Sequence, residues 1–572
     1  MNDIKYLFGF YGRYKGKLIA IACLYALSTL CSLATPTVMS MVVDNGIRNA
    51  DFRAITLLCT AMICVAACSF ACAVISNKLS SSVANSVARD LRNELFKKVN
   101  SLSFEEFSKI GTSSLLTRAT EDVLNLESAD TLIYAFINVP VLLVGGITLS
   151  FIADVYLALI MLAAVPLVCV AVFFLVRKMG KLWDTADKYC DAQNKIVRER
   201  LYGIRVIRAF DKEEHEHGRI TEATDKMAKN LVTANAFSGL ITPICSCLLN
   251  LATVVIIYIG YLRASSSALS AGKVIAVTQY VALISSALLT VFWTLAWIPH
   301  VKVSAKRVGE VLSLKGVPKS DEEPELITGD LKLENVSFAY PDSHAYSLEN
   351  VTAVFPQGKT IGVIGGTGSG KSTLVKLLLD FYPVTQGKIT FGGKNYEDIT
   401  KESIRNSISC AMQKSMIFEG TIKENVAISD DCATDEDVVS AVTDAQLASF
   451  VNEQSEGLNY PLSQSGTNLS GGQKQRVNIA RTILKKSSVY VFDDSFSALD
   501  FLTESNLRKA LAVRLKGKTQ IIITQRISTA IKCDFVYVLD GGKIAGGGTH
   551  EQLLESCEVY REIYRSQTGE RE

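Results

Sequence analysis

The sequence predicts an α-helical membrane domain followed by an α/β domain, and three observations support this prediction. The 572 residues are 48% apolar and 20% charged, which is too hydrophobic for an ordinary soluble protein and too charged for a purely membrane one. Long apolar runs fill the N-terminal part of the chain. A glycine-rich loop lies between an apolar strand-like run and a helix-like run in the C-terminal part. Two domains that fold in different solvents are therefore expected.

Six apolar runs are long enough to cross a bilayer as helices. They lie at about 18–43, 54–75, 131–152, 155–176, 240–262 and 274–299. The first follows a basic N-terminus and is too long for a signal-peptide core, so we expect it to remain uncleaved. The segments 77–130 and 177–238 are long and basic, which places them on the cytoplasmic side. The sequence thus predicts a multi-pass cell-membrane protein whose N-terminus and C-terminal domain are cytoplasmic.

The two basic segments are expected to be more than loops. Neither contains a proline, and both are rich in helix-forming residues with apolar repeats. Continuous helices would carry the spans well beyond the bilayer, at about 1.5 Å per residue. The membrane domain is therefore expected to have six transmembrane helices with long cytoplasmic extensions.

A polar, proline-bounded stretch at 317–325 separates the last span from the rest of the chain. Beyond it, strand-like and helix-like runs alternate, as expected of an α/β core. We expect a membrane domain at 1–315, a linker at 316–329 and the α/β domain at 330–572. The polar tail, 566–572, is expected to be frayed.

Charge, cysteine and histidine usage disfavour several other classes of protein. The formal net charge of +2 gives no support for nucleic-acid binding. The 14 cysteines show no C-x-x-C spacing and many lie in apolar runs, so they are interpreted as small hydrophobic residues, with metal binding as the weaker alternative. His215 and His217 are the one close histidine pair, and their charged neighbours indicate a solvated loop.

The glycine-rich loop fits the G-x-x-x-x-G-K-[ST] phosphate-binding pattern. It follows the apolar run 360–364 and precedes a helix-like run. Glycines let successive backbone N–H groups turn toward a polyphosphate, Lys371 would reach the terminal phosphates, and Ser372 would bind Mg²⁺. The alternative, a glycine-rich turn with an incidental lysine, is disfavoured by the strand–loop–helix context. The candidate nucleotide-binding residues are Gly365, Gly366, Thr367, Gly368, Ser369, Gly370, Lys371, Ser372 and Thr373.

A second motif, taken with the first, resembles the ATPase domain of ABC transporters. It consists of Leu469, Ser470, Gly471, Gly472 and Gln473, which precede a helical run, with an apolar strand ending at Asp493 shortly after it. In that family two such domains face each other head to tail, and each ATP lies between one phosphate loop and the partner's LSGGQ signature. A serine hydroxyl and glycine amides at a helix N-terminus form a second anion cradle.

The resemblance covers the whole chain and implies an exporter-type membrane domain followed by an α/β P-loop ABC-type ATPase domain. It implies ATP and Mg²⁺ as cofactors. It also implies short transverse helices near 101–108 and 209–216 that dock on the ATPase domains. Ordinary amphipathic surface helices remain the alternative for both segments.

Further residues match motifs of the family. Tyr340 matches the aromatic residue that stacks on adenine, with a plain core tyrosine as the alternative. Gln413 matches the loop glutamine that touches Mg²⁺ and the attacking water, and Asp493 matches the carboxylate that holds Mg²⁺. Asp500 lies in the loop that communicates across the dimer. The resemblance therefore implies Ser372, Gln413 and Asp493 as the Mg²⁺ ligands.

Three positions depart from the family pattern. Asp494 stands where the family has its catalytic glutamate, and its carboxylate is withdrawn by about 1 Å, whereas general-base catalysis depends on hydrogen-bond reach. Gln525 stands in place of the switch histidine and cannot carry a positive charge. Gln464, in 463–466, stands where many exporters have a glutamate, so cross-talk with the partner's membrane helices is in doubt.

The signature, in contrast, is complete, and this asymmetry predicts the chain's role. A chain with a weakened base and switch can still complete the ATP site of another chain. We therefore expect one half of a heterodimeric, multidrug-type bacterial ABC exporter, whose partner is a non-identical half-transporter with an intact glutamate and histidine. A homodimeric lipid or peptide exporter and an ATP-binding regulator or sensor are the alternatives.

The spans carry few groups that are costly in lipid. The candidates for a cavity lining are Asn138, Asn250, Gln279, Tyr280, Trp293 and Trp297, with helix–helix hydrogen bonds and interfacial aromatics as the equally strong alternative. The spans contain no charge cluster that would suit an ion or a strongly charged solute. Amphipathic drugs, lipids or hydrophobic peptides are therefore the expected cargo.

Overall fold

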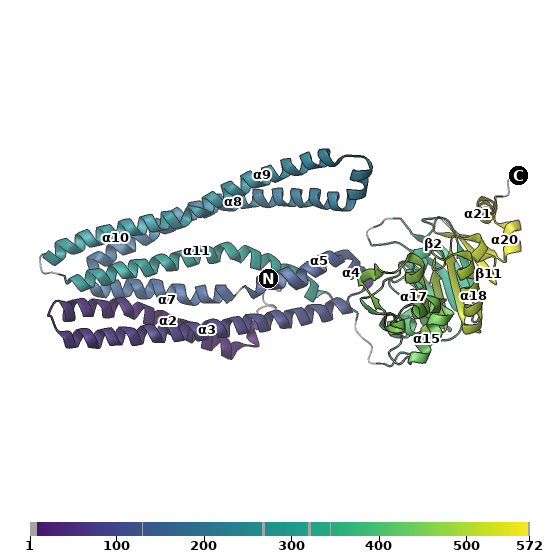
Figure 1. The fold of residues 1–572 in the computed structure, drawn as a ribbon, viewed down its shortest axis with the longest axis horizontal. Helices are drawn as coiled ribbons and strands as arrows, with labels where there is room; N and C mark the ends of the chain where they lie inside the picture. Colours follow the sequence, from purple (N-terminus) through teal and green to yellow (C-terminus); the bar gives the residue numbers. More distant parts are fainter. Residues whose placement is uncertain are drawn as a thin grey trace. The chain divides into compact units, whose positions relative to one another are not determined.

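The fold is taken from a computed structural model, which describes residues 9–128, 130–265, 269–317, 322–341, 343 and 345–569. The chain divides into two compact units (Figure 1). The membrane unit comprises Met1–Asn100 and Gly111–Lys315, and the α/β unit comprises Ser101–Ile110 and Gly316–Glu572. Part of the expected linker, residues 318–321, lies outside the described residues.

The membrane unit is entirely helical over its described residues. The described part contains six helical stretches that are long and apolar enough to cross a bilayer, so the prediction of six spans is confirmed. The helices are α2 (Lys15–Met41), η1 (Val42–Ile47), α3 (Phe52–Ser101), α5 (Thr112–Thr117), η2 (Arg118–Asp122), α6 (Val123–Glu127), α7 (Asp130–Ala153), α8 (Val155–Ala209), α9 (Glu213–Gly239), α10 (Ile241–Ser265) and α11 (Ala271–Ser313).

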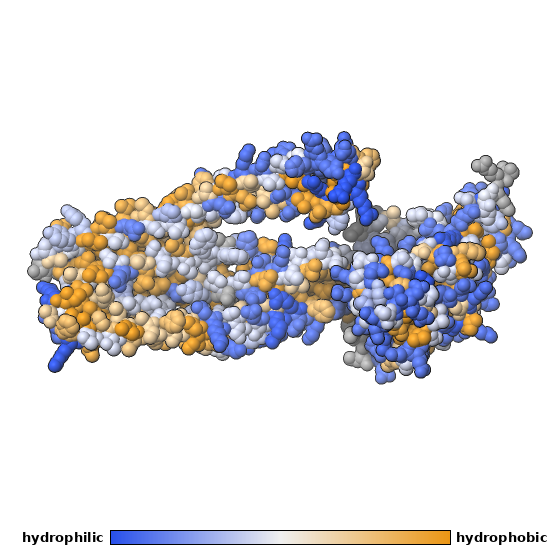
Figure 2. All heavy atoms as spheres, viewed as in Figure 1, coloured by the Kyte–Doolittle hydropathy of each residue, from blue (hydrophilic) through white to orange (hydrophobic). Residues whose placement is uncertain are grey.

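The long extensions expected of the spans are present. Helix α3 has 50 residues and α8 has 55, and at 1.5 Å per residue they extend for roughly 75 and 83 Å, far more than the roughly 30 Å of a hydrocarbon core. The surface of α8, α9 and α10 is apolar over α10 and hydrophilic toward the α8–α9 turn (Figure 2). Such a change along one helix is expected where a helix leaves lipid and enters water.

One of the two expected short helices is present and the other is not. Helix α4 (Phe104–Ile110) falls in the α/β unit, where the Phe104 ring stacks on Phe381 with centroids 5.0 Å apart and 8° between planes. Near 209–216 the expectation was wrong. A tight turn at Phe210–Lys212 joins α8 directly to α9, and Asp211 accommodates the turn at φ 51°.

The α/β unit is built on a largely parallel six-stranded sheet of order β12-β11-β3-β10-β9-β6, in which the β11–β12 pair is antiparallel. A four-stranded sheet, β2-β1-β4-β5, and a two-stranded one, β7-β8, complete it. The strands are β1 (Leu331–Phe338), β2 (Leu348–Phe355), β3 (Thr360–Ile364), β4 (Gln386–Phe391), β5 (Lys394–Asn395), β6 (Ile408–Ala411), β7 (Gly420–Thr421), β8 (Pro461–Leu462), β9 (Val489–Asp493), β10 (Thr519–Thr524), β11 (Phe535–Asp540) and β12 (Lys543–Gly548).

The central strands are apolar throughout because both of their faces are buried. In β10, Ile521 and Ile523 belong to one hydrophobic cluster while Ile522 belongs to another on the opposite face. The helices of the unit are α12 (Lys371–Leu378), α13 (Lys401–Ser407), α14 (Ile422–Ala427), α15 (Asp435–Asp444), α16 (Ala448–Glu453), α17 (Gly471–Leu484), α18 (Phe501–Arg514), α19 (Ile527–Ala530), α20 (His550–Ser556) and α21 (Glu558–Thr568).

The C-terminal tail is more ordered than its polarity suggests. Helix α21 continues to Thr568, so the expectation of a frayed segment was wrong for residues 566–568. The helix is amphipathic, and Tyr560 is fully buried in a cluster with Ile527, Val536 and Leu553. Residues 570–572 lie outside the described part of the chain.

Candidate nucleotide site

Four neighbouring parallel strands bring the candidate site residues to one edge of the sheet. In the register, Thr524 pairs with Ile364, Ile523 with Asp493, and Ala411 with Phe492. The segments that directly follow β3, β10, β9 and β6 therefore leave the sheet side by side. These segments carry the phosphate loop, Gln525, Asp494 and Gln413, which lie far apart in the sequence. Ligands of open α/β sheets bind at this carboxyl edge.

The phosphate loop forms the expected connection between β3 and α12. Gly368 and Gly370 adopt φ values of 81° and 102°, which glycine reaches without steric cost. A side chain at Gly365 would place its Cβ 2.1 Å from the carbonyl oxygen of Leu539, so only glycine fits there. The exposed Ser372 hydroxyl follows at the start of α12.

Lys371 is folded back into this loop. Its Nζ donates to the carbonyl oxygens of Gly365, at 2.8 Å, and Gly366, at 2.5 Å, and to Ser369 Oγ at 3.2 Å. Burial lowers the pKa of Lys371, while the nearby carboxylates of Asp494 and Asp493 oppose that shift. The loop thus holds the Lys371 ammonium group through neutral carbonyl oxygens. A polyphosphate would bind that cation more strongly.

Tyr340 lies two residues beyond β1 and is half-buried in an aromatic cluster. Its ring meets the rings of Phe338 and Tyr382 edge-on, at 5.0 and 5.5 Å. Lys376 Nζ lies 5.1 Å from the ring centroid. Because Tyr382 also contacts Phe104 at 5.5 Å, aromatic side chains link α4 to Tyr340.

Asp493 ends β9 as a buried carboxyl group. Burial, reinforced by the neighbouring Asp494, raises the pKa of Asp493 to about 6, against the opposing effect of Lys371 and the backbone of Gln413. Lys371 thus offsets only part of the cost of ionising a carboxyl group that lies out of water beside a second carboxyl group. A divalent cation would supply further positive charge.

Asp494 adopts φ 47°, a left-handed conformation that aspartate tolerates better than most residues. Its backbone is fixed on both sides, since its N–H donates to Ile523 O at 2.9 Å and its carbonyl accepts from Ser497 Oγ at 2.8 Å. Among the described residues, its carboxylate has no recorded hydrogen-bond partner. The side chain therefore remains available at the edge of the sheet. Gln525 follows β10, and its side chain is exposed at the same edge.

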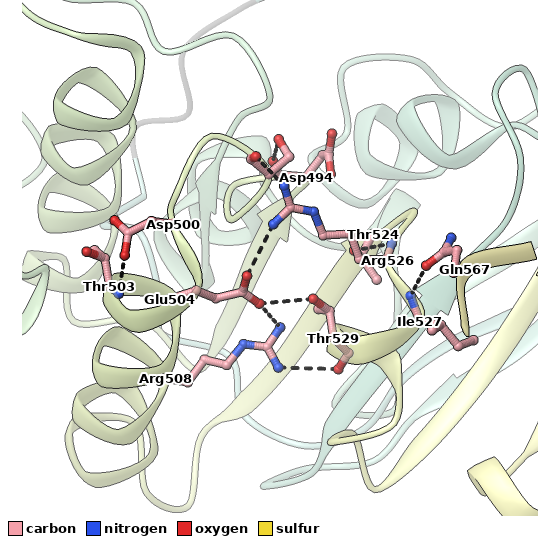
Figure 3. Close-up of polar contacts among 11 residues, drawn as sticks. Asp494, Asp500, Thr503, Glu504, Arg508, Thr524, Arg526, Ile527, Thr529 and Gln567 are labelled. Carbon is pink, nitrogen blue, oxygen red and sulfur yellow. Dashed lines mark hydrogen bonds and ion pairs between the residues drawn. The ribbon is translucent and has the colours of Figure 1, made fainter. Parts of the chain in front are cut away.

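Glu504 of α18 joins three segments around this edge (Figure 3). Its carboxylate lies 2.9 Å from Arg508 and 3.3 Å from Arg526, and it accepts a hydrogen bond from Thr529 Oγ1 at 3.1 Å. Arg526 also donates to the carbonyl oxygen of Ser497 at 2.6 Å. The Arg526 guanidinium, which the buried Glu504 carboxylate holds, thus fastens the segment after β10 to the loop after β9.

Gln567 of α21 holds the backbone on both sides of Arg526, and Figure 3 shows its contact with Ile527. Its Nε2 donates to the carbonyl oxygen of Gln525 at 2.7 Å, and its Oε1 accepts from the N–H of Ile527 at 2.8 Å. Sequence analysis missed Gln567 and Glu504. No local pattern identifies them, although the apolar face of α21 indicates that this segment packs as a helix.

The signature residues form the N-terminal end of α17. Ser470 is the N-cap: its Oγ accepts from the N–H of Gln473 at 3.3 Å, and the Gln473 side chain accepts from the N–H of Ser470 at 2.7 Å. This capping box leaves the Ser470 hydroxyl proton and the amides of Gly471 and Gly472 free to bind a ligand. Leu469 is buried beneath this end of the helix, whereas Ser470 and Gly471 are exposed.

The signature adjoins the Ser497–Asp500 loop. A Cβ at Gly472 would lie 3.1 Å from the carbonyl oxygen of Ala498, so the two segments touch. Asp500 caps α18 by accepting from the N–H of Thr503 at 2.9 Å, and this backbone hydrogen bond lowers the pKa of the Asp500 carboxyl group. The capping role fully accounts for the position of Asp500 within this chain.

The residues at the edge fit a magnesium nucleotide. Glycine amides and Lys371 suit a polyphosphate, while the exposed Ser372 hydroxyl, the Gln413 segment and the buried Asp493 carboxyl group offer the oxygen ligands that Mg²⁺ takes in proteins. When bound, Mg²⁺ would neutralise negative charge that develops on the phosphate. No group of three or more His, Cys, Asp or Glu side chains that could hold a metal occurs in the described residues, so the phosphates would complete the ligand set.

The comparisons with known proteins agree with this architecture. Residues 18–288 match the family model of the ABC transporter transmembrane region, and residues 348–497 match that of the ABC transporter ATPase. An ABC transporter ATP-binding protein of Mycobacterium tuberculosis is 33% identical over 563 residues, which cover 97% of this chain and 96% of the relative. This chain therefore belongs to the ABC transporter family. It is an exporter-type half-transporter with an ABC ATPase domain.

Other relatives and a solved structure extend the comparison. YfiB of Bacillus subtilis, an ABC transporter ATP-binding protein, is 33% identical over 96% of both chains. The "Probable multidrug resistance ABC transporter ATP-binding/permease protein YheI" of Bacillus subtilis is 30% identical over 83% of this chain and 82% of the relative. The structure of a bacterial Atm1-family ABC exporter with ATP bound shares the fold, with a TM-score of 0.81 and 22% identity over 98% of this chain and 99% of that one.

Membership of the ABC transporter family indicates the cellular setting of the site. The six apolar helices and the exporter fold make this a multi-pass membrane protein, and the family implies a cytoplasmic ATPase domain. ABC exporters act as dimers within a membrane, and their ATPase domain hydrolyses ATP to drive transport.

Proposed function

We propose that this chain is one half of a heterodimeric ABC exporter and that its own ATP site is degenerate. Its signature, Leu469–Gln473, completes the ATP site of a non-identical partner, which supplies an intact glutamate and histidine. One observation carries the proposal. Asp494 and Gln525 stand at the two positions where the family has its catalytic groups, while the signature helix is complete in sequence and capped by Ser470.

The roles of the remaining residues follow from this arrangement. Tyr340 stacks on the adenine of ATP, and Gly365–Thr373 hold its phosphates. Ser372, Gln413 and Asp493 hold Mg²⁺, and Asp500 lies in the loop that communicates across the dimer. Asp494 is poorly placed as a general base because its side chain is one methylene shorter than glutamate, which withdraws the carboxylate by about 1 Å. Gln525 donates a hydrogen bond to the γ-phosphate without adding positive charge.

The cargo in this proposal is an amphipathic small molecule, lipid or peptide. The apolar spans carry polar but uncharged candidates such as Asn138, and YheI, a relative, is named for multidrug resistance. A homodimeric exporter is disfavoured because it would have two weakened sites. A regulator that only binds ATP is disfavoured by the complete signature.

Steady-state ATP turnover tests the proposal. The isolated chain, whose self-pairing would offer two weakened sites, is expected to hydrolyse ATP at least about 10²-fold more slowly than the complex purified with its partner, the lower end of the effect of a general base. Equal specific activity of the isolated chain and the complex would contradict the heterodimer.

The occupancy of the two ATP sites gives a second test. Since the residues for binding are present and those for chemistry are weakened, labelled ATP at this chain's own site should persist through many turnovers of the complex. The measurement is the release of labelled nucleotide after a chase with unlabelled ATP. A single fast phase that accounts for both sites would contradict the proposal.

A further inference from the structure

A polar cavity of about 540 Å³ lies within the membrane unit, among α2, α3, α7 and α11. Its volume is in the range of small-molecule sites, roughly 300–1,000 Å³. All of its described lining side chains except Ala73, Leu142 and Leu283 carry a hydroxyl or a carboxamide group, and none is charged. These polar groups come from four different helices, so the cavity is a feature of the fold rather than of one helix.

Polar side chains are costly in the span of a membrane helix unless they meet protein partners or water. Sequence analysis left two interpretations open for the span residues, and the structure supports both of them at Tyr280. Tyr280 is buried, and its hydroxyl lies 2.6 Å from Thr37 Oγ1 in a contact between α11 and α2, but it also lines a separate cavity of about 220 Å³. Asn138 lines the polar cavity. Asn250, Trp293 and Trp297 are not among the lining residues.

On one wall of the cavity, the serine hydroxyl groups hydrogen-bond to one another and to the backbone. The Oγ atoms of Ser28 and Ser32 lie 3.3 and 3.2 Å from Ser69 Oγ, which joins α2 to α3. Ser32 also donates to the carbonyl oxygen of Ser28, at 3.0 Å. Hydroxyl groups that bond in this way keep further lone pairs for a ligand, because each oxygen is both donor and acceptor.

On the other wall, two hydrogen-bonding atoms have no recorded partner among the described residues. The Tyr25 hydroxyl lies 2.8 Å from Asn77 Oδ1, and Asn138 Nδ2 lies 3.0 Å from the Tyr134 hydroxyl, while the two tyrosine rings meet edge-on at 5.0 Å. In the part of the chain that the structure describes, Asn77 Nδ2 and Asn138 Oδ1 have no recorded partner. A donor and an acceptor therefore line the same empty volume.

We propose that this cavity binds an uncharged, hydrogen-bonding group of the exported molecule, such as sugar hydroxyls or peptide amides. The inference rests on the proposed export function and narrows its cargo. A charged headgroup would lose its hydration without gaining a counter-charge, since no charged side chain lines the cavity. A purely apolar molecule would leave the lining groups without partners.

Photolabelling of the full-length chain in nanodiscs tests the inference directly. The probe is dodecyl glucoside with a photoactivatable diazirine beside the sugar, and the competitors share its chain but carry a glucose, sulfate or trimethylammonium headgroup. We expect cross-links on α2, α3, α7 and α11. Unlabelled dodecyl glucoside should compete at an at least about tenfold lower concentration than either charged compound, because the charged compounds lack a partner in the cavity.

Two variants and a control connect this selectivity to the cavity. Asn138→Leu, which removes the amide at nearly constant size, is expected to raise the half-competing glucoside concentration about fivefold. A Ser32→Ala, Ser69→Ala double variant should do the same and decides the matter if Asn138→Leu fails to fold. Asn250→Leu replaces a span asparagine that lies outside the cavity, so its half-competing concentration should stay within about twofold of wild type.

Equal competition by the three headgroups would overturn the inference, as would cross-links elsewhere. An equal effect of the Asn138 and Asn250 variants would overturn it too. These outcomes are independent of the proposed asymmetry, because labelling requires neither ATP turnover nor the partner. If the turnover assay contradicts the heterodimer, the labelling result can still support or overturn the cavity proposal.

Discussion

The carboxyl edge of the six-stranded sheet and the N-terminal end of α17 are the two places that our proposal assigns to nucleotide phosphates. At the edge, Asp494 and Gln525 stand where the family has a glutamate and a histidine, although Lys371 and the glycine loop are complete. At the helix end, the signature and its capping box are intact. In the proposal, both places keep their binding groups, and only the edge has weakened groups for chemistry.

In the proposed heterodimer, this difference lets one chain lose chemistry without losing its contribution to the dimer. The two places lie on separate elements but share one loop: Arg526 of the edge donates to the carbonyl oxygen of Ser497, and Gly472 of the signature approaches the carbonyl oxygen of Ala498. Side-chain substitutions at Ser470, Asp494 or Gln525 leave both of these backbone contacts in place, so the comparison can be tested one side at a time.

The largest effect is expected at the helix end. Ser470→Arg places a bulky cation where the signature approaches the partner's ATP, so turnover of the assembled complex should fall by at least about 10²-fold. Asp494→Asn removes a carboxylate that is already poorly placed, and it should change turnover by less than about tenfold, with ATP still bound. Steady-state turnover and nucleotide occupancy of the two variant complexes give the measurement.

The reverse pattern would break the comparison. If Asp494→Asn abolished turnover and Ser470→Arg did not, the working site would lie on this chain's own sheet edge. Thr467→Arg is a suitable control for the added charge. Thr467 is exposed three residues before Ser470, outside the signature, and should tolerate the substitution.

A gain of function should be the next largest effect. Restoring the family residues with Asp494→Glu and Gln525→His in the isolated chain is expected to raise its ATP turnover by at least about tenfold, since a well-placed base alone contributes about 10²- to 10⁴-fold. The gain should stay below the full contribution of a well-placed base, because position 494 has φ 47°, a backbone conformation that suits aspartate better than glutamate. No gain from the double variant would mean that another defect limits the site.

Much of this comparison was predictable from the sequence because motifs are local. The glycine loop, the signature and the ends of β9 and β10 are short patterns whose geometry follows from backbone chemistry, and the register of the parallel strands then brings them together. The six spans follow equally directly from the lengths of the apolar runs.

Features that depend on contacts between distant segments were not predictable. Glu504 pairs with Arg526, and Gln567 bonds to the backbone of Gln525, each more than twenty residues away in the sequence. No local sequence pattern indicates either contact. The short helix near 209–216 was expected from the resemblance to exporters, whereas Asp211, at φ 51°, turns the chain directly from α8 into α9. Similarly, only packing places Asn138 at the polar cavity and Tyr280 in a contact with Thr37 beside a smaller cavity.

The smallest effect should come from Gln567, whose side chain holds the backbone around Gln525 without touching the nucleotide phosphates in this arrangement. Gln567→Ala removes both hydrogen bonds, so the switch segment should become less well placed and labelled ATP should leave this chain's own site about threefold faster. Gln567→Glu keeps an acceptor for the Ile527 N–H but loses the donor to Gln525 O, so it should have an intermediate effect. Thr568→Ala is the matched control, since Thr568 bonds within its own helix to Tyr564 O at 2.9 Å. Equal release rates for Gln567→Ala and Thr568→Ala would show that α21 stabilises the fold without positioning Gln525, whereas faster release for Gln567→Ala alone would assign the C-terminal helix to the sheet-edge site.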